Sequence, residues 1–490
     1  MNDILLIQPP IGLPELYNKP EKELDSKSYA IKTKCTRVPQ NLLSLATVLD
    51  DLNYKVDIFD CRLYYSNGRE NYIKILKERI KNTNLLIGIS VTTPYITQTV
   101  EIINLIKEVN SNVYIVVGGI HPTLFPKQTC KDKDIDFVIS GDGEYPLCEL
   151  VTALEEKKSY NKIKGLTYKK NNQVITNPLG EPFNIRKSPI PAYHLFDMEK
   201  YLPWTPYYSE KKTIGLDYLT TRGCPFKCSF CVNDILPQNR GWRSKTSNQV
   251  IEELSILKEK YKFDYVYFED DNAFLNKEHS LDVSKRLIKD DFNINYLATI
   301  RIDTLLNTPK SYLETFKKSG WSETILGVES GSDKILKVLN KGITIEQSLK
   351  SIKILKDLDI WTAYNFMTCI PGEQHKERQE TYNLMRKTKK IHPKSLIVGP
   401  HLFRPFPGSK LYPQCIKGGL DEPKTFREWS DTPLYISGDV SNLPWIKDYL
   451  PIEKYESYIK IYGLTPLIKK AIGSLYWNLL TSRRSSNTEW

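Results

Sequence analysis

The residues best suited to chemistry are three closely spaced cysteines, Cys224, Cys228 and Cys231, in the segment TTRGCPFKCSFC. Thiolates bind iron–sulfur clusters and zinc, but a structural zinc site takes four protein ligands. The next cysteine, Cys369, lies far along the chain, so the loop by itself leaves one metal position open. The spacing therefore predicts an iron–sulfur cluster with one iron open to a further ligand. A zinc site completed elsewhere and unrelated thiols are the alternatives.

Acidic and glycine-containing segments recur at intervals after the cysteines. They are FEDDNAF (268–274), ATIRID (298–303), LGVESGS (326–332), MTCIPGE (367–373) and FRPFPGS (403–409). Any one of them is typical of a turn. Because each one follows an expected strand, their ordered recurrence indicates a single site built from the ends of several strands.

Six strands and the helices between them must position these segments. Apolar runs predict strands at 214–220, 264–269, 294–301, 323–328, 362–369 and 396–403. Helical periodicity predicts helices at about 246–261, 279–289, 309–318, 344–357 and 374–390. Consecutive β/α units in this number favour a curved, partly closed barrel, since eight units make a complete one.

The first part of the chain predicts another α/β arrangement, a parallel doubly wound (Rossmann-like) sheet. Strands are expected at 4–7, 56–59, 85–90, 113–117 and 137–140, and helices at 39–52, 72–81 and 98–109. The loops 90–94 (SVTTP), 118–122 (GGIHP) and 141–144 (GDGE) follow three of these strands. Such sheets bind ligands at the carboxyl ends of their strands, so these loops are candidate ligand contacts.

These patterns divide the chain into four parts. They are an N-terminal α/β domain (1–155), a linker with a small hairpin at 165–176 (156–212), a partial barrel (213–408) and a mostly helical C-terminal substrate or capping region (409–490). Thr465 and Pro466 begin a basic, apolar helix in the last part. We expect this helix to pack on the barrel or to contact a membrane surface peripherally.

Composition limits the class of protein. The 490 residues are 40% hydrophobic and 26% charged, which is typical of a soluble globular chain. No apolar run reaches the roughly 18 residues of a membrane-spanning helix, and the start MNDILLIQPP does not resemble a signal peptide, so a cytoplasmic location is expected. The net charge of +11 accompanies no nucleic-acid-binding motif, so no nucleic-acid partner is expected. The nine cysteines are expected to be metal ligands or reduced thiols.

The cysteine loop and the segments after it resemble the radical S-adenosylmethionine (SAM) superfamily. The resemblance implies a 4Fe-4S cluster held by Cys224, Cys228 and Cys231, with SAM chelating the fourth iron. It further implies that SAM is contacted by Phe230, Glu269, Asp270 (with Asp271 as the fallback), Arg301, Glu329 and Ser330.

The segments LLIQPP, NYKVDIFDC, GGIHPTLFP and DFVISGDGEYPLCEL resemble the cobalamin-binding domain of cobalamin-dependent radical SAM enzymes, of the class B methyltransferase and anaerobic magnesium-protoporphyrin ester cyclase type. The resemblance implies a cobalamin site formed by Ser90, Thr92, Thr93, Gly118, Gly119, His121, Gly141, Asp142, Gly143 and Glu144. The DxHxxG motif that supplies an axial histidine to cobalt is absent, so no protein imidazole on cobalt is implied. His121 is assigned to contacts with the nucleotide tail of cobalamin. The alternatives are that His121 is an ordinary turn histidine and that the whole domain has lost its ligand.

The implied reaction is methylation of an unactivated carbon through a 5′-deoxyadenosyl radical and methylcobalamin. The alternatives are a cobalamin-dependent oxidative cyclase without net methyl transfer and a non-catalytic cobalamin and cluster sensor. A methylthiotransferase is disfavoured because Cys35, Cys61 and Cys130 lack a Gly-Cys-x-x-Asn-like setting. The resemblance leaves a small molecule, a lipid or a peptide as substrate, and it implies an electron donor such as flavodoxin or ferredoxin.

Overall fold

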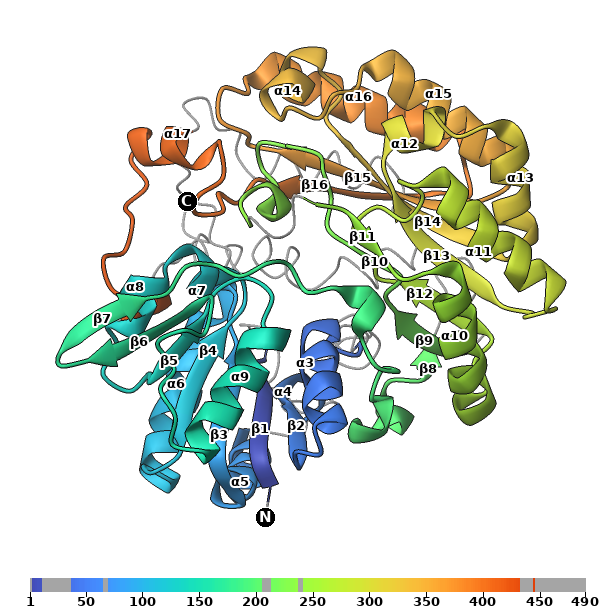
Figure 1. Ribbon diagram of the computed structural model, residues 1–490. Helices are drawn as coiled ribbons and strands as arrows, with labels where there is room; N and C mark the ends of the chain where they lie inside the picture. The colour runs from blue at the N-terminus through green and yellow to red at the C-terminus, as the bar shows by residue number, and fades with distance from the viewer. Residues whose placement is uncertain are drawn as a thin grey trace.

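The computed structural model describes residues 2–10, 37–64, 69–204, 213–236, 241–431 and 444–445. Within these residues the chain forms two seven-stranded sheets, each flanked by helices, which lie in two adjoining parts of the molecule (Figure 1). The predicted fold class is confirmed. No helix in the described ranges is long and apolar enough to cross a membrane. The basic helix expected from Thr465 onward lies outside the described residues.

The first sheet has the strand order β2-β1-β3-β4-β5-β6-β7, and its first five strands are parallel. Its strands are β1 (Asn2–Gln8), β2 (Val56–Asp60), β3 (Thr83–Ser90), β4 (Tyr114–Gly118), β5 (Phe137–Ile139), β6 (Leu166–Lys170) and β7 (Gln173–Thr176). Its helices are α3 (Gln40–Asp51), α4 (Cys61–Tyr64), α5 (Arg69–Lys81), α6 (Ile96–Val109), α7 (Ile120–Leu124), α8 (Pro126–Cys130) and α9 (Glu144–Glu155).

Alternating side chains of the first sheet bury two separate apolar layers. Leu6 belongs to the cluster that packs under α3 and α9, whereas its neighbours Leu5 and Ile7 belong to the cluster under α5 and α6. Successive side chains of a strand point to opposite faces, so a continuous apolar run is the pattern of a strand covered on both sides. This explains why all five parallel strands could be predicted.

The hairpin predicted at 165–176 is present as β6 and β7. The two strands pair with each other and add to β5 in antiparallel fashion, so they extend the first sheet. The interval predicted as a linker, 156–212, therefore includes two strands of the first sheet. Apolar residues of the hairpin, such as Leu166 and Tyr168, join the core of that sheet.

The second sheet has the order β16-β15-β14-β13-β12-β9-β8, and all its strands except the edge strand β8 run parallel. Its strands are β8 (Pro203–Trp204), β9 (Thr213–Tyr218), β12 (Tyr265–Phe268), β13 (Asn295–Ile300), β14 (Trp321–Glu329), β15 (Trp361–Thr368) and β16 (Leu396–Leu402). A separate ribbon pairs β10 (Thr221–Arg222) with β11 (Arg243–Ser244). The six predicted strands correspond to the six parallel ones.

In the part of the chain that the structure describes, the helices of this domain cover the outer side of the second sheet (Figure 1). They are α10 (Ser247–Tyr261), α11 (Lys277–Lys289), α12 (Ile302–Leu306), α13 (Lys310–Lys318), α14 (Asp333–Val338), α15 (Ile345–Asp357) and α16 (His375–Ile391). Val266 and Phe268 of β12 pack in the large cluster under these helices, while Tyr265 and Tyr267 belong to a small separate cluster with Leu297. The inner side is thus the less apolar one, and β9 and β16 are not adjacent in the strand order, as in a partly open barrel.

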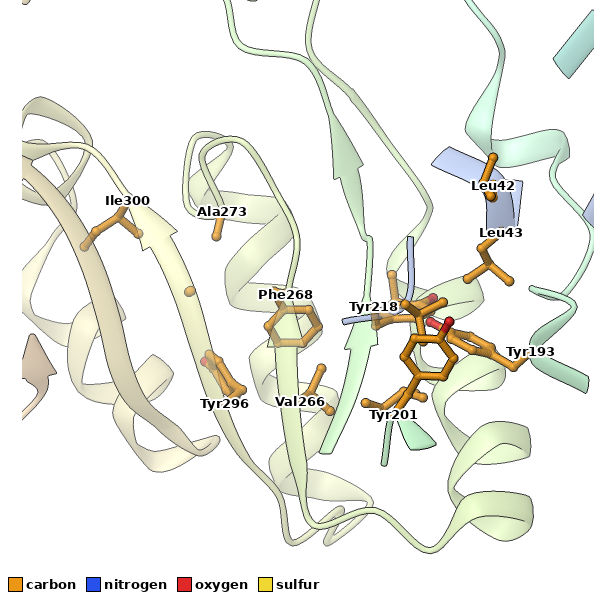
Figure 2. Packing of buried hydrophobic residues seen from close by; sticks show 14 of the residues in the cluster. Leu42, Leu43, Tyr193, Tyr201, Tyr218, Val266, Phe268, Ala273, Tyr296 and Ile300 are labelled. Carbon is orange, nitrogen blue, oxygen red and sulfur yellow. The ribbon is translucent and has the colours of Figure 1, made fainter. Parts of the chain in front are cut away.

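Two regions join the sheets. Leu42 and Leu43 of α3 pack in one cluster with Tyr193, Tyr201 and Tyr218, and Figure 2 shows this aromatic group beside Leu43. After β16 the chain forms α17 (Tyr412–Lys417) and the 3-10 helix η9 (Arg427–Asp431), which packs against α6 of the first domain. The two domains therefore share cores near α3 and near η9.

Candidate active site

The loop that carries the cysteines is held to the second sheet by two consecutive carboxylates. Asp270, two residues after β12, accepts hydrogen bonds from the backbone amides of Thr220 and Thr221, both at 2.8 Å. Asp271 accepts from the amide of Gly223 at 2.9 Å and from the Asn233 side chain at 2.7 Å. Burial raises the pKa of Asp270 to about 6. Both carboxylates therefore position the loop, and the contact of Asp270, or of Asp271, with SAM stays a prediction.

The three cysteines follow this anchored segment. Cys228 is buried and Cys224 and Cys231 are partly buried, and burial raises the pKa of Cys231 to about 11. The amide of Ser229 donates to the carbonyl of Leu339 at 2.8 Å, which ties the loop to the end of α14.

The three cysteine thiols can be compared with the ligands that a single metal ion or a 4Fe-4S cluster needs. In the described part of the chain no group of three His, Cys, Asp or Glu side chains is placed to hold one metal ion. A 4Fe-4S cluster binds each thiolate to a different iron, so its ligands need not converge on one point. Three thiols in one partly buried loop, with a guanidinium against the middle one, fit such a cluster better than a single zinc ion.

That guanidinium belongs to Arg301, at the end of β13. Its Nη1 donates to Cys228 Sγ at 3.0 Å, and its plane lies over the Phe226 ring at 3.7 Å. Its other nitrogens donate to both carboxylate oxygens of Asp303, at 2.9 and 2.8 Å, and to the carbonyl of Lys341 at 2.7 Å. Arg301 thus contacts the cysteine loop, and its predicted contact with SAM stays a prediction.

Two further predicted SAM residues, Glu329 and Ser330, lie at the end of β14. Glu329 has a φ of +68°, a conformation that costs a non-glycine residue free energy. Its carboxylate accepts from Lys341 Nζ at 2.7 Å, and Lys341 also lies 5.8 Å from the centre of the Phe230 ring. The Ser330 hydroxyl instead accepts from the amide of Ser332 at 3.1 Å and lies 3.1 Å from the Thr381 hydroxyl of α16. The structure thus brings Glu329 and Phe230 together through Lys341.

The remaining predicted SAM residue, Glu269, pairs with a residue of the first domain. Arg37 Nη1 donates to Glu269 Oε1 at 3.0 Å, and the same guanidinium lies 3.9 Å from the centre of the Tyr267 ring. Burial raises the pKa of Glu269, and the Arg37 charge opposes that rise. The amide of Val38 donates to Asp217 at 2.9 Å, so the segment just before α3 reaches the ends of both β9 and β12.

A cavity of about 530 Å³ lies at the carboxyl ends of the parallel strands of the first sheet. Eight of the ten predicted cobalamin residues line it: Ser90, Thr92, Gly118, Gly119, Gly141, Asp142, Gly143 and Glu144. Gly88, in the middle of β3, lines it as well, and a Cβ there would lie 2.8 Å from Leu6 Cδ2. Gly119 has a φ of +105°, which requires glycine, and a Cβ would meet the Val91 carbonyl oxygen at 2.8 Å. A cradle of glycines lets a large ligand approach the backbone closely, so the cavity fits part of a cobalamin.

The other two predicted cobalamin residues, Thr93 and His121, do not line the cavity. Both are buried, and the Thr93 hydroxyl lies 3.2 Å from His121 Nδ1. The His121 ring contacts Phe125, Phe426 and Trp429, so the segment that returns from the barrel covers it. Burial lowers the pKa of His121 to about 3. His121 therefore makes a packing contact between the two domains, and its assignment to the nucleotide tail stays a prediction.

The cavity wall also includes Leu219 and Arg222 of the second domain. Arg222 Nη1 donates to Glu144 Oε1 at 2.7 Å and Nη2 donates to Ser44 Oγ at 3.1 Å. Burial by itself would raise the pKa of Glu144, but the Arg222 guanidinium, the Ser44 hydroxyl and a backbone amide together lower it. Arg243 Nη1 donates to Asp142 Oδ2 at 2.6 Å.

The sequence analysis missed several site residues, namely Arg37, Gly88, Arg222, Arg243 and Lys341. Two of them carried a signal. A glycine inside the apolar run of β3 marks a close approach to the backbone, and Arg222 stands two residues before Cys224. Of the other cysteines, Cys61 and Cys130 are buried in the apolar core of the first domain, and Cys35 lies outside the described residues.

The fold and the site define an α/β protein with a cysteine loop suited to an iron–sulfur cluster and with a glycine-lined cavity, and comparison with known proteins agrees. Residues 218–385 match the radical SAM superfamily and residues 28–151 match the B12 binding domain. The chain is 31% identical over 351 residues to an uncharacterised methyltransferase of Pyrococcus horikoshii, covering 70% of this chain and 72% of that protein. The chain belongs to the cobalamin-binding radical SAM family.

Two further relatives indicate the range of this family. The anaerobic magnesium-protoporphyrin IX monomethyl ester cyclase of Rubrivivax gelatinosus is 28% identical over 309 residues, 61% of this chain and 54% of that enzyme. The solved structure of the radical SAM methyltransferase TsrM from Kitasatospora setae aligns with a TM-score of 0.66 at 16% identity, over 99% of this chain and 100% of that one, which shows a common fold. The chain is thus a radical SAM enzyme that is similar to methyltransferases, and its cofactors are a 4Fe-4S cluster, SAM and cobalamin.

Proposed function

We propose that this enzyme methylates an unactivated carbon of a small-molecule substrate. The observation that carries the proposal is the junction of the two sites. Leu219 and Arg222 line the glycine-rich cavity, and they lie five and two residues before Cys224 in the chain. A cofactor in the cavity and a cluster on the cysteine loop would therefore face the same space between the domains.

When bound, the cluster and SAM supply a 5′-deoxyadenosyl radical and cobalamin supplies a methyl group. The residues of the chain hold these groups in register, which is where an enzyme of this kind contributes most. Asp270 and Asp271 anchor the cysteine loop to the second sheet through its backbone amides. Cys224, Cys228 and Cys231 would hold the cluster, and Glu329 with Lys341 provides a buried polar pair beside it.

An oxidative cyclase without net methyl transfer is the second candidate. It is favoured by the similarity to the Rubrivivax cyclase, although the chain spans 54% of that enzyme. The two candidates differ in the fate of the methyl group of SAM, so they can be separated before the substrate is known.

We further propose a flavodoxin or a ferredoxin as the physiological electron donor.

The test uses the full chain, reconstituted anaerobically with iron, sulfide and hydroxocobalamin, then reduced and mixed with SAM carrying a deuterated methyl group. We expect the label in the corrinoid fraction together with S-adenosylhomocysteine, and 5′-deoxyadenosine that disappears in Cys228→Ala. Release of 5′-deoxyadenosine without label in the corrinoid would favour the cyclase. The absence of both labelled corrinoid and 5′-deoxyadenosine would favour a sensor without turnover.

A further inference from the structure

A buried bridge of ionic groups joins the cavity loop of the first domain to the cysteine loop of the second. Arg222 donates to Glu144 at 2.7 Å and lies 3.7 Å from Asp142, while Arg243 donates to Asp142 at 2.6 Å. The side chains are 18% exposed for Arg222 and 3% exposed for Glu144. The sequence analysis assigned both carboxylates to cobalamin, yet each is occupied by an arginine of the other domain.

We propose that Arg222 is a positioning residue, which sets the place of the cysteine loop relative to the cobalamin cavity through Glu144 and Asp142. The proposal rests on the proposed function, because it assumes that both cofactors bind. It assigns the two carboxylates to the bridge and removes them from the set of direct cobalamin contacts.

The first argument is mechanical. The backbone of residues 220–223 is fixed on the side of the second sheet by Asp270 and Asp271, and by the pairing of β10 with β11. Arg222 lies within this short segment and reaches the opposite way, to the first residue of α9. The segment is thus held from both sides, so a shift of the cavity loop would be transmitted to Cys224, two residues further on.

The second argument is energetic. Charge-assisted hydrogen bonds between buried ions are short and directional, and loss of one partner leaves the other charge buried and uncompensated. Ser44 of α3 adds to the geometry, since its hydroxyl donates to Glu144 and accepts from Arg222. The guanidinium fork therefore contacts two elements of the first domain, α3 and α9, which a single point charge could not satisfy in the same way.

The third argument distinguishes this bridge from a general contact between the domains. Arg427 of η9 also joins the two domains, with ion pairs to Asp132 at its Nε and to Asp134 at 2.9 Å. Arg427 lies far along the chain from the cysteines and does not line the cavity. It offers a matched control, an arginine with two aspartate partners whose removal weakens the same domain contact elsewhere.

The experiment measures position directly. The holoenzyme is reduced so that the cluster and cob(II)alamin are both paramagnetic, and pulsed electron paramagnetic resonance gives the distribution of distances between them. We expect one narrow distribution in the unmodified enzyme and in Arg427→Gln, and a broad one in Arg222→Gln at unchanged iron and cobalt content. Arg222→Lys keeps the positive charge but lacks the planar guanidinium, so its distance distribution should have an intermediate width. A narrow distribution in Arg222→Gln, or equal broadening in Arg427→Gln, would overturn the proposal.

A second measurement needs no cofactor. The bridge predicts that Arg222→Gln and Glu144→Gln each lower the melting temperature and that the double variant melts no lower than the worse single one, because the two residues act as a pair. Additive losses would contradict the pairing.

Cobalamin affinity separates the two assignments of Glu144. A direct contact predicts that Glu144→Gln weakens cobalamin binding much more than Arg222→Gln, whereas the bridge predicts equal effects. Failure of the unmodified chain to bind cobalamin would contradict the proposed function and leave the melting test of the bridge in force.

Discussion

Replacement of Arg301 by glutamine should make the iron–sulfur cluster harder to reduce. Arg301 Nη1 donates to Cys228 Sγ at 3.0 Å, and the residue is held there by Asp303, by the carbonyl of Lys341 and by the ring of Phe226. Reduction adds one negative charge to the cluster. A guanidinium against a ligand sulfur stabilises the reduced state more than the oxidised one, so its loss lowers the midpoint potential.

The size of the effect follows from the strength of that hydrogen bond. A hydrogen bond to a charged group contributes about 1.5–3 kcal/mol. If roughly half of this free energy acts on the reduced state alone, the difference is about 0.75–1.5 kcal/mol. For a one-electron couple about 1.4 kcal/mol corresponds to about 59 mV, so the potential should fall by about 30–60 mV.

The assay is a potentiometric titration of the reconstituted protein, followed by the electron paramagnetic resonance signal of the reduced cluster. Lys334→Gln is the control, because it removes an exposed positive charge that pairs with Glu377 at 2.9 Å and does not touch the cysteines. The control should titrate like the unmodified protein. A potential in Arg301→Gln that is unchanged or higher, at full iron content, would refute the reasoning.

Three further predictions concern stability and the cavity. Gly119→Ala should cost about 1–3 kcal/mol and weaken cobalamin binding measured by absorption titration, because its φ of +105° is strained for alanine; Gly241→Ala, where no atom lies within 4 Å of a new Cβ, should change neither. Lys341→Met leaves the buried Glu329 carboxylate unpaired and should cost about 3–5 kcal/mol in chemical denaturation, part of which a second change, Glu329→Gln, restores. Burial raises the pKa of Asp217 to about 7, so ionisation in the unfolded state costs stability as pH rises from about 4 to 7. Asp217→Asn should raise the melting temperature at pH 8 and not at pH 4, and equal shifts at both values would contradict this.

The strands could be predicted because each parallel strand is a short apolar run between polar segments. Residues Ile4–Ile7, for example, are all buried, so this strand is a continuous apolar run that stands out from the polar residues around it. Helix α9 was missed because Pro146 lies in it, three residues after Gly143. Proline is tolerated in the first turn of a helix, where its missing amide needs no partner, so a proline there does not exclude a helix.

The cluster and cavity loops could be located from motifs, but the direction of individual side chains could not. Glu269, Asp270 and Asp271 are consecutive acids, and only the structure separates the first, which pairs with Arg37, from the two that hold the cysteine loop. The partner of Glu144 lies 78 residues further along the chain. His121 is covered by residues near 426–429. Such pairs form where the two domains contact each other, and no local sequence pattern predicts that contact.

The central claim is that one chain holds both a cluster and a cobalamin at adjoining loops, and metal analysis after anaerobic reconstitution tests it most directly. The account predicts about four irons and one cobalt per chain in the unmodified protein. It also predicts that Cys228→Ala loses the iron and keeps the cobalt, while Gly88→Val, which fills the cavity, loses the cobalt and keeps the iron. Iron without cobalt in the unmodified protein, or joint loss of both metals in each variant, would contradict the account.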